Sequence, residues 1–233
     1  MFGLDDAIVS LSSGGSVAVV LLVAAALGLR HATDPDHIAA VTTVVASGQE
    51  RAARSAARLG ACWGLGHALT LVVFGLPVLL SQQFLPERVQ QGAETAVAAL
   101  IVFLALRLLV RWRHGYFDLH AHPHEERHHR HPVRSPLGAF AIGLVHGMGG
   151  SAGVGVLLLA AIPSTTTAVA SLLVLAVFTA VSMTLVTTGL GATLAARRAL
   201  GASGTVAPVL GVASLAFGVW YAAAAWGVLA YPF

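Results

Sequence analysis

The chain has 233 residues, of which 57% are hydrophobic and only 10% are charged. Soluble domains carry about 25% charged residues, so this composition excludes an ordinary soluble protein and predicts an all-α integral membrane protein. The formal charge of +3 rests on arginine, because the chain has no lysine, and arginines placed between apolar stretches indicate membrane topology and not nucleic-acid binding. The single cysteine, Cys62, excludes an intrachain disulfide and any multi-cysteine metal site.

Six apolar stretches are long enough to cross a bilayer as helices. They lie at 16–46, 57–80, 91–112, 136–162, 166–190 and 206–230. The first stretch is longer than a straight span needs, so we expect tilt and an interruption at Asp34-Pro35. The glycines around His146 predict a second interruption, or very close packing, in the fourth stretch.

The chain contains two pairs of similar segments, which suggest an internal duplication. Gly28-Leu29-Arg30-His31 resembles Gly143-Leu144-Val145-His146, and 70–76 resembles 184–190. Because three spans are an odd number, the two halves would have opposite orientations, which is a transporter architecture. We therefore expect two inverted three-helix repeats, at 1–112 and 136–233, around a histidine-rich segment at 113–135. Chance similarity between apolar segments is the alternative.

Arginines gather in every second connection between the predicted spans. They are Arg51, Arg54 and Arg58 in the first, Arg111, Arg113, Arg127, Arg130 and Arg134 in the second, and Arg197 and Arg198 in the third. The positive-inside rule then predicts a multi-pass protein of the cell (inner) membrane with both termini outside and the histidine-rich segment in the cytoplasm.

The first predicted span contains the costliest residues to bury, among them His31, Asp34, Asp36 and His37. A charged group at the bilayer centre costs at least about 2.5–3.5 kcal/mol, so these groups need partners or a solvated cavity. On a continuous helix they would not converge, but unwinding at Pro35 would turn them toward one point and free backbone carbonyls as further ligands. Histidines and carboxylates bind divalent metals; the alternative is a kinked helix whose charges pair with each other and with Arg30.

Two further histidines lie in predicted spans. His67 is a candidate ligand or pathway residue, or else a hydrogen bond between helices, and the glycines beside it permit close helix packing. By the repeat, His146 would face His31 across the pseudo-symmetry axis, as a ligand, as a support for one, or as a packing residue. Asp34 is a candidate hydrogen-bond acceptor for the histidines, and Ser151 is a candidate pathway residue.

The segment between the third and fourth spans is rich in histidine. Its candidate metal-capturing residues are His120, His122, His124, His128, His129 and His131. A low-complexity linker with no required role is the alternative. Glu94 and Arg107 are expected near the ends of the third span, with their charged groups reaching the membrane surface.

The motif residues resemble a known family. His31-Ala32-Thr33-Asp34-Pro35-Asp36-His37 fits the H-x4-D-H signature of the nickel/cobalt transporter family, and the stretch around Leu65-Gly66-His67 is similar to its second histidine motif. The resemblance implies uptake of Ni²⁺ or Co²⁺ into the cytoplasm.

The chain also departs from that family. The family usually has eight spans, and its later motif containing Asp, Thr and Glu is replaced here by His146-Gly147-Met148-Gly149-Gly150-Ser151. This variant looks more like the branch associated with urease gene clusters. Histidine-rich loops also occur in related exporters, so the resemblance leaves the direction of transport open.

Together these features predict a secondary transporter for Ni²⁺, with Co²⁺ as a second candidate ion, and a site at the bilayer midplane. His31, Asp36 and His37 form the expected core of this site, His67 completes it, and His146 lies nearby. The ion is substrate, no cofactor is expected, and the sequence does not predict the oligomeric state. The alternatives are an exporter of metal or another solute and a membrane-embedded metalloenzyme, although no nucleophile–base pair suggests an enzyme.

Overall fold

The computed structural model describes residues 16–46, 53–81, 86–114, 135–149, 159–160, 162–199 and 203–230. These residues form helices, and no strand occurs among them. The helices are α2 (Val17–His31), α3 (Pro35–Ala46), α4 (Ala53–Ser81), α5 (Glu87–Arg113), α6 (Pro136–His146), α8 (Thr165–Ala199) and α9 (Ser203–Ala225). The loop histidines from His120 to His131, and Ser151, lie outside the described residues.

Four helices, α4, α5, α8 and α9, are long and apolar enough to cross a membrane. They coincide with the second, third, fifth and sixth predicted spans. Helices α2 and α3 pass the same test together as one span bent by 47°, which matches the expected interruption of the first stretch. Helix α6 covers only the first part of the fourth predicted span. The described residues therefore contain four helices that could cross a membrane, or five spans with the bent pair, and the fourth predicted span stays a prediction.

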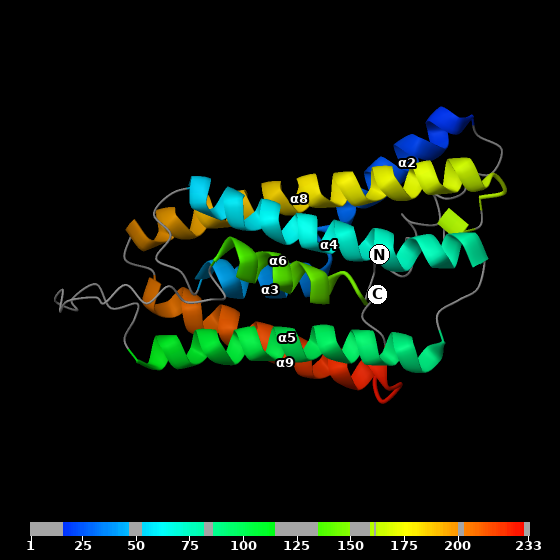
Figure 1. Ribbon diagram of the computed structural model, residues 1–233. Helices are drawn as coiled ribbons and strands as arrows, with labels where there is room; N and C mark the ends of the chain where they lie inside the picture. The colour runs from blue at the N-terminus through cyan, green and yellow to red at the C-terminus, as the bar shows by residue number, and fades with distance from the viewer. Residues whose placement is uncertain are drawn as a thin grey trace.

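The two short helices α3 and α6 lie in the middle of the bundle (Figure 1). The pair formed by α4 and α8 lies on one side of them, and the pair formed by α5 and α9 lies on the other. Helix α2 packs against α8, and α6 packs against α4. The ends of the two short helices are therefore held inside the bundle, where a polar residue meets other helices and not lipid.

Glycines allow α4 to approach its neighbours closely. A Cβ atom on Gly64 would stand 2.8 Å from the Ala180 carbonyl oxygen of α8. One on Gly66 would collide with the Phe140 carbonyl of α6, and one on Gly143 with the Trp63 carbonyl of α4. Close packing at the glycines beside His67 is thus confirmed, and it brings the backbone of α6 against that of α4.

Helices α2 and α6 share a local design. Each ends at a histidine, His31 or His146, and each has a glycine three residues earlier that packs against a partner helix. At Gly28 the neighbour is α8, since a Cβ there would stand 2.6 Å from the Leu175 carbonyl oxygen. This correspondence fits a duplication, but the inverted repeat and the orientation of the chain in the membrane stay predictions.

The expectation that Glu94 reaches the membrane surface is wrong. Glu94 is only 3% exposed, because it lies on the face of α5 that packs into the bundle. The other buried residues of that face are Val97, Ala98, Ile101, Leu104, Ala105 and Leu108. Glu94 therefore lies at one end of an apolar stripe, inside the protein.

Candidate metal centre

The break between α2 and α3 positions the first group of polar residues. Helix α2 ends at His31, residues 32–34 form a turn, and Pro35 is the first residue of α3, where its missing N–H is not needed. The expected release of backbone carbonyls is wrong for two of them. Thr33 N–H donates to the Arg30 carbonyl (2.9 Å), and Asp34 N–H donates to the His31 carbonyl (3.1 Å). The possible metal ligands at the break are therefore side chains and not these two carbonyl oxygens.

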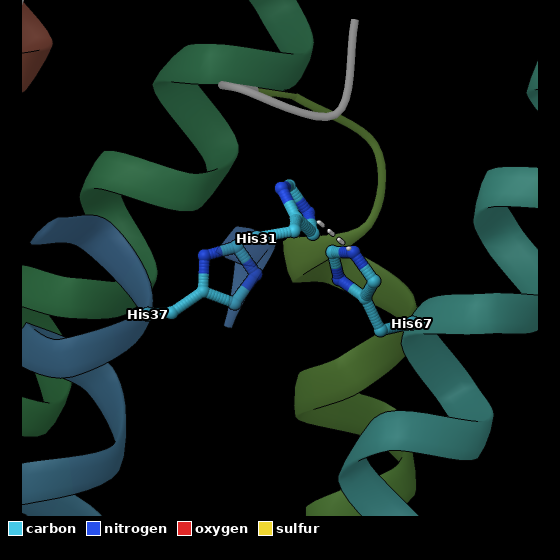
Figure 2. Close-up of side chains that lie close together, drawn as sticks. All are labelled: His31, His37 and His67. Carbon is cyan, nitrogen blue, oxygen red and sulfur yellow. Dashed lines mark hydrogen bonds between the residues drawn. The ribbon is translucent and has the colours of Figure 1, made fainter. Parts of the chain in front are cut away.

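Three histidines from three helices converge at this break. His31 ends α2, His37 lies in the first turn of α3, and His67 lies in the middle of α4 (Figure 2). The Nε2 atoms of His31 and His67 are 3.0 Å apart, and His37 offers a nitrogen within 4.8 Å of a nitrogen on each of the other two. All three residues are at most 7% exposed.

Two buried carboxylates contact the Nδ1 atoms of two of these rings. Oδ2 of Asp34 lies 3.2 Å from Nδ1 of His31. Oδ1 of Asp36 lies 3.0 Å from Nδ1 of His37, which donates to it. An ionised carboxylate only accepts hydrogen bonds, so it favours the neutral tautomer that carries its proton on Nδ1 and leaves the Nε2 lone pair free. Among the described residues, Nε2 of His37 has no hydrogen-bond partner.

The same carboxylate joins a fourth histidine to the cluster. Nε2 of His146, at the end of α6, lies 3.2 Å from Oδ2 of Asp36 and donates to it. Asp36 and His146 are both fully buried, and they form a second possible metal-binding group with His37. The His31 and His146 rings each lie close to the His37 ring, at 4.6 Å and 4.5 Å between centroids. The structure thus brings the three predicted core residues together with His67 and His146, and His37 lies at the centre.

The charge pairing that the alternative interpretation requires is also present. Nη2 of Arg30 lies 3.7 Å from Oδ1 of Asp34. Asp34 therefore faces both Arg30 and His31. The cationic guanidinium stabilises the carboxylate without occupying the nitrogen side of the histidine cluster.

Sequence reasoning missed Trp63 as a neighbour of the cluster. Its ring is 6% exposed and lies 5.8 Å from the rings of both His37 and His146. The signal was its position four residues before His67, which places both on one face of a helix. A large apolar wall beside the histidines excludes water from that side.

The predicted peripheral residues divide into two groups. Asp34 lies against the cluster, as described above. Ser151 and the loop histidines lie outside the described residues, so their roles stay predictions. His114, which is described, lies exposed at the end of α5 and far along that helix from the buried Glu94.

Comparisons with known proteins give one informative match. No protein-family model matches the chain, and no solved structure matches it. The chain is 27% identical over 209 residues to the urease accessory protein UreH of Bacillus sp. (strain TB-90). The match covers 87% of this chain and 90% of that relative, so the chain is similar to a urease accessory protein over most of its length and not only at the histidine motifs.

Proposed function

We propose that this protein is a secondary transporter that moves Ni²⁺, and also Co²⁺, across the cytoplasmic membrane into the cell. The observation that carries the proposal is the 3.0 Å separation of the His31 and His67 Nε2 atoms inside a bundle of apolar helices, with His37 beside them. The similarity to a urease accessory protein supports it, because the motif around His146 resembles the urease-associated branch of the nickel/cobalt transporter family.

The nitrogen spacing suits one shared metal ion. Histidine nitrogens bind a divalent metal such as zinc at about 2.0–2.1 Å. Two nitrogens at that distance and at 90° to each other are about 3.0 Å apart, which is the separation of the two Nε2 atoms. A right angle between ligands belongs to square-planar or octahedral coordination, and imidazole suits Ni²⁺. The hydrogen bond between the two rings would give way to the ion once the ring that carries the shared proton moves it to its other nitrogen.

Asp36 is expected from the sequence to bind the ion directly, but its contacts suit a role in orienting the histidine rings. Both of its oxygens are engaged, one with His37 and one with His146, so binding the ion directly would cost it a histidine contact. We therefore assign metal binding to His31, His37 and His67, and orientation of the rings to Asp34 and Asp36. The two carboxylates beside the cluster, one of which also pairs with Arg30, offset part of the positive charge of the ion, which lowers the cost of holding it in a membrane.

The alternatives predict different measurements. Export predicts that expression lowers the metal content of cells, whereas uptake predicts a rise. A membrane-embedded metalloenzyme predicts turnover of a substrate without movement of the ion. Elemental analysis of cells supplied with Ni²⁺, Co²⁺ or Zn²⁺ separates the two directions of transport.

The site is tested with purified protein and matched histidine variants. His37→Ala is expected to abolish Ni²⁺ binding measured by calorimetry and to abolish uptake, while size-exclusion chromatography shows a folded protein. The exposed His114→Ala is the control and is expected to keep both activities. Retention of binding by His37→Ala, His31→Ala and His67→Ala alike would refute the proposed site.

A further inference from the structure

Glu94 is a buried carboxylate that the proposed site does not use. It is 3% exposed, and it lies on α5, a helix that contributes none of the proposed ligands. An ionisable group inside a membrane bundle is costly, and such groups usually mark the path of an ion or a proton. The face that it shares with Val97 and Ile101 is otherwise apolar, so packing alone does not explain a carboxylate there.

The hydrogen bonding of Glu94 leaves its charge uncompensated. Nε2 of Gln90, one helical turn earlier, donates to Oε1 of Glu94 at 3.0 Å. Within the part of the chain that the structure describes, no arginine or histidine pairs with this carboxylate. An amide dipole stabilises an anion less than a cation does, so the position is one where a mobile cation would be favoured.

The position of Glu94 connects it to the histidine cluster. A Cβ atom on Gly149 would stand 3.0 Å from the backbone nitrogen of Glu94, so the chain leaving α6 packs directly on α5 at this residue. Gly149 is three residues past His146, and His146 contacts Asp36, which contacts His37. The backbone of α5 at Glu94 therefore packs against the short segment that follows His146, a residue of the cluster.

Glu94 also lies toward the end of α5 that is opposite to three of its four arginines, since only Arg88 stands near the same end. It is near the start of α5 at Glu87, whereas Arg107, Arg111 and Arg113 belong to the last part of that helix. If the arginine-rich end is cytoplasmic, as the positive-inside rule predicts, Glu94 lies between the outside and the cluster.

We propose that Glu94, with Gln90, forms a transient cation site that the transported ion occupies before it reaches the histidines. The inference rests on the proposed function. A carboxylate and an amide oxygen bind divalent ions with less selectivity than imidazole does, so this first site concentrates the ion and the histidines select it. A site on a conduction path must bind weakly enough to release the ion again, and a single carboxylate meets that condition.

The chain supplies its own control for this proposal. Glu87 and Gln91 form the same pair four residues apart, with Gln91 Nε2 donating to Glu87 Oε1 at 3.1 Å, but on the exposed surface of α5. Glu87→Gln and Glu94→Gln therefore remove the same charge from the same helix, and each keeps a side-chain oxygen that can accept the same kind of hydrogen bond. Only the second removes the charge from the interior.

The test measures uptake of Ni²⁺ into cells at concentrations below saturation, and equilibrium Ni²⁺ binding to the purified protein. Glu94→Gln is expected to lower the initial uptake rate about tenfold, the lower limit for electrostatic focusing of an ion. Its equilibrium affinity is expected to stay within about twofold of wild type, because the histidines are intact. Glu87→Gln is expected to change neither, and Glu94→Asp, which keeps the charge, is expected to retain most of the uptake.

Three outcomes would overturn the inference. Uptake by Glu94→Gln equal to that of Glu87→Gln would show that the carboxylate has only a structural role. A loss of equilibrium affinity as large as the loss of uptake would show that Glu94 supports the cluster itself. Uptake by a folded Glu94→Asp as low as that of Glu94→Gln would show that charge is not what matters. Failure of the proposed function is distinguishable, because wild-type protein would then neither bind nor accumulate Ni²⁺ or Co²⁺.

Discussion

Gly147 lies where the end of α6 packs against α4 beside His67. Replacing it with a larger residue tests whether the distance between His146 and His67 matters for the site. Gly147 directly follows His146, and a Cβ atom there would stand 2.8 Å from the His67 carbonyl oxygen and 3.0 Å from Cβ of Thr70. Favourable contacts between carbon atoms lie at about 3.5–4.0 Å, so Gly147→Ala must move the end of α6 away from α4 by roughly 0.5–1 Å.

The expected cost of Gly147→Ala follows from two opposing effects. Overpacking of a tight interface typically costs about 1–3 kcal/mol. The residue has a φ of −75°, which alanine adopts without strain, so restriction of the unfolded chain returns about 0.4–1 kcal/mol. We therefore expect a net loss of about 1–2 kcal/mol in the free energy of unfolding. Because the shift moves His146, which holds the His37 ring through Asp36, we also expect Ni²⁺ affinity to fall about tenfold, which corresponds to about 1.4 kcal/mol.

Gly92→Ala is the control for this prediction. No heavy atom lies within 4 Å of a Cβ placed on Gly92, so the same substitution there meets open space. Thermal unfolding in detergent followed by tryptophan fluorescence, together with calorimetric titration of Ni²⁺, measures both effects. The reasoning is refuted if Gly147→Ala matches Gly92→Ala in both stability and affinity.

Three further predictions concern the groups around the ion. Asp34→Asn is expected to lower Ni²⁺ affinity by about 10–100-fold, since it removes the carboxylate that orients His31; Arg30→Gln, measured by the same titration, shows how much of that loss comes from the Arg30 pair. Acidification is expected to weaken Ni²⁺ binding, because a protonated imidazole cannot bind a metal. A titration at successive pH values checks this, and an affinity that is constant or rises as pH falls would contradict binding by histidine. Deletion of residues 118–131 is expected to leave uptake nearly unchanged while lowering the number of ions bound per chain, as measured by elemental analysis.

Convergence of the polar residues in the first span could be predicted from the sequence. Charged groups in a membrane must find partners, and Pro35 prevents the helix from continuing past the residues that need them. The distribution of the contacts could not be predicted in the same way. Asp36 reaches His37 next to it, but its second oxygen meets His146, 110 residues later. That contact depends on how α6 lies between the other helices, which no local pattern encodes.

The role expected for Glu94 failed for a reason that the sequence itself contains. The expected exposure of Glu94 rests on its position along the helix, close to the end of the predicted span. Whether the side chain faces lipid or the protein interior depends instead on the helix face on which it lies. Glu94, Val97, Ala98 and Ile101 follow the i, i+3, i+4, i+7 spacing of a single helix face, and that face is buried. The i, i+3, i+4, i+7 spacing predicts that Glu94 faces the interior of the bundle. It does not show that the end of α6 packs on this residue.

The central position of His37 links the two groups of side chains. His37 belongs to both possible metal-binding groups, one with His31 and His67 and one with Asp36 and His146. Under the proposed assignment the first group holds the ion, and Asp36, which accepts from His37 and from His146, fixes the orientation of the shared ring. Desolvation is the main cost of carrying a divalent ion through a membrane. A ring that is already oriented loses less freedom when the ion binds, so the buried carboxylate lowers the cost of that transfer without binding the ion itself.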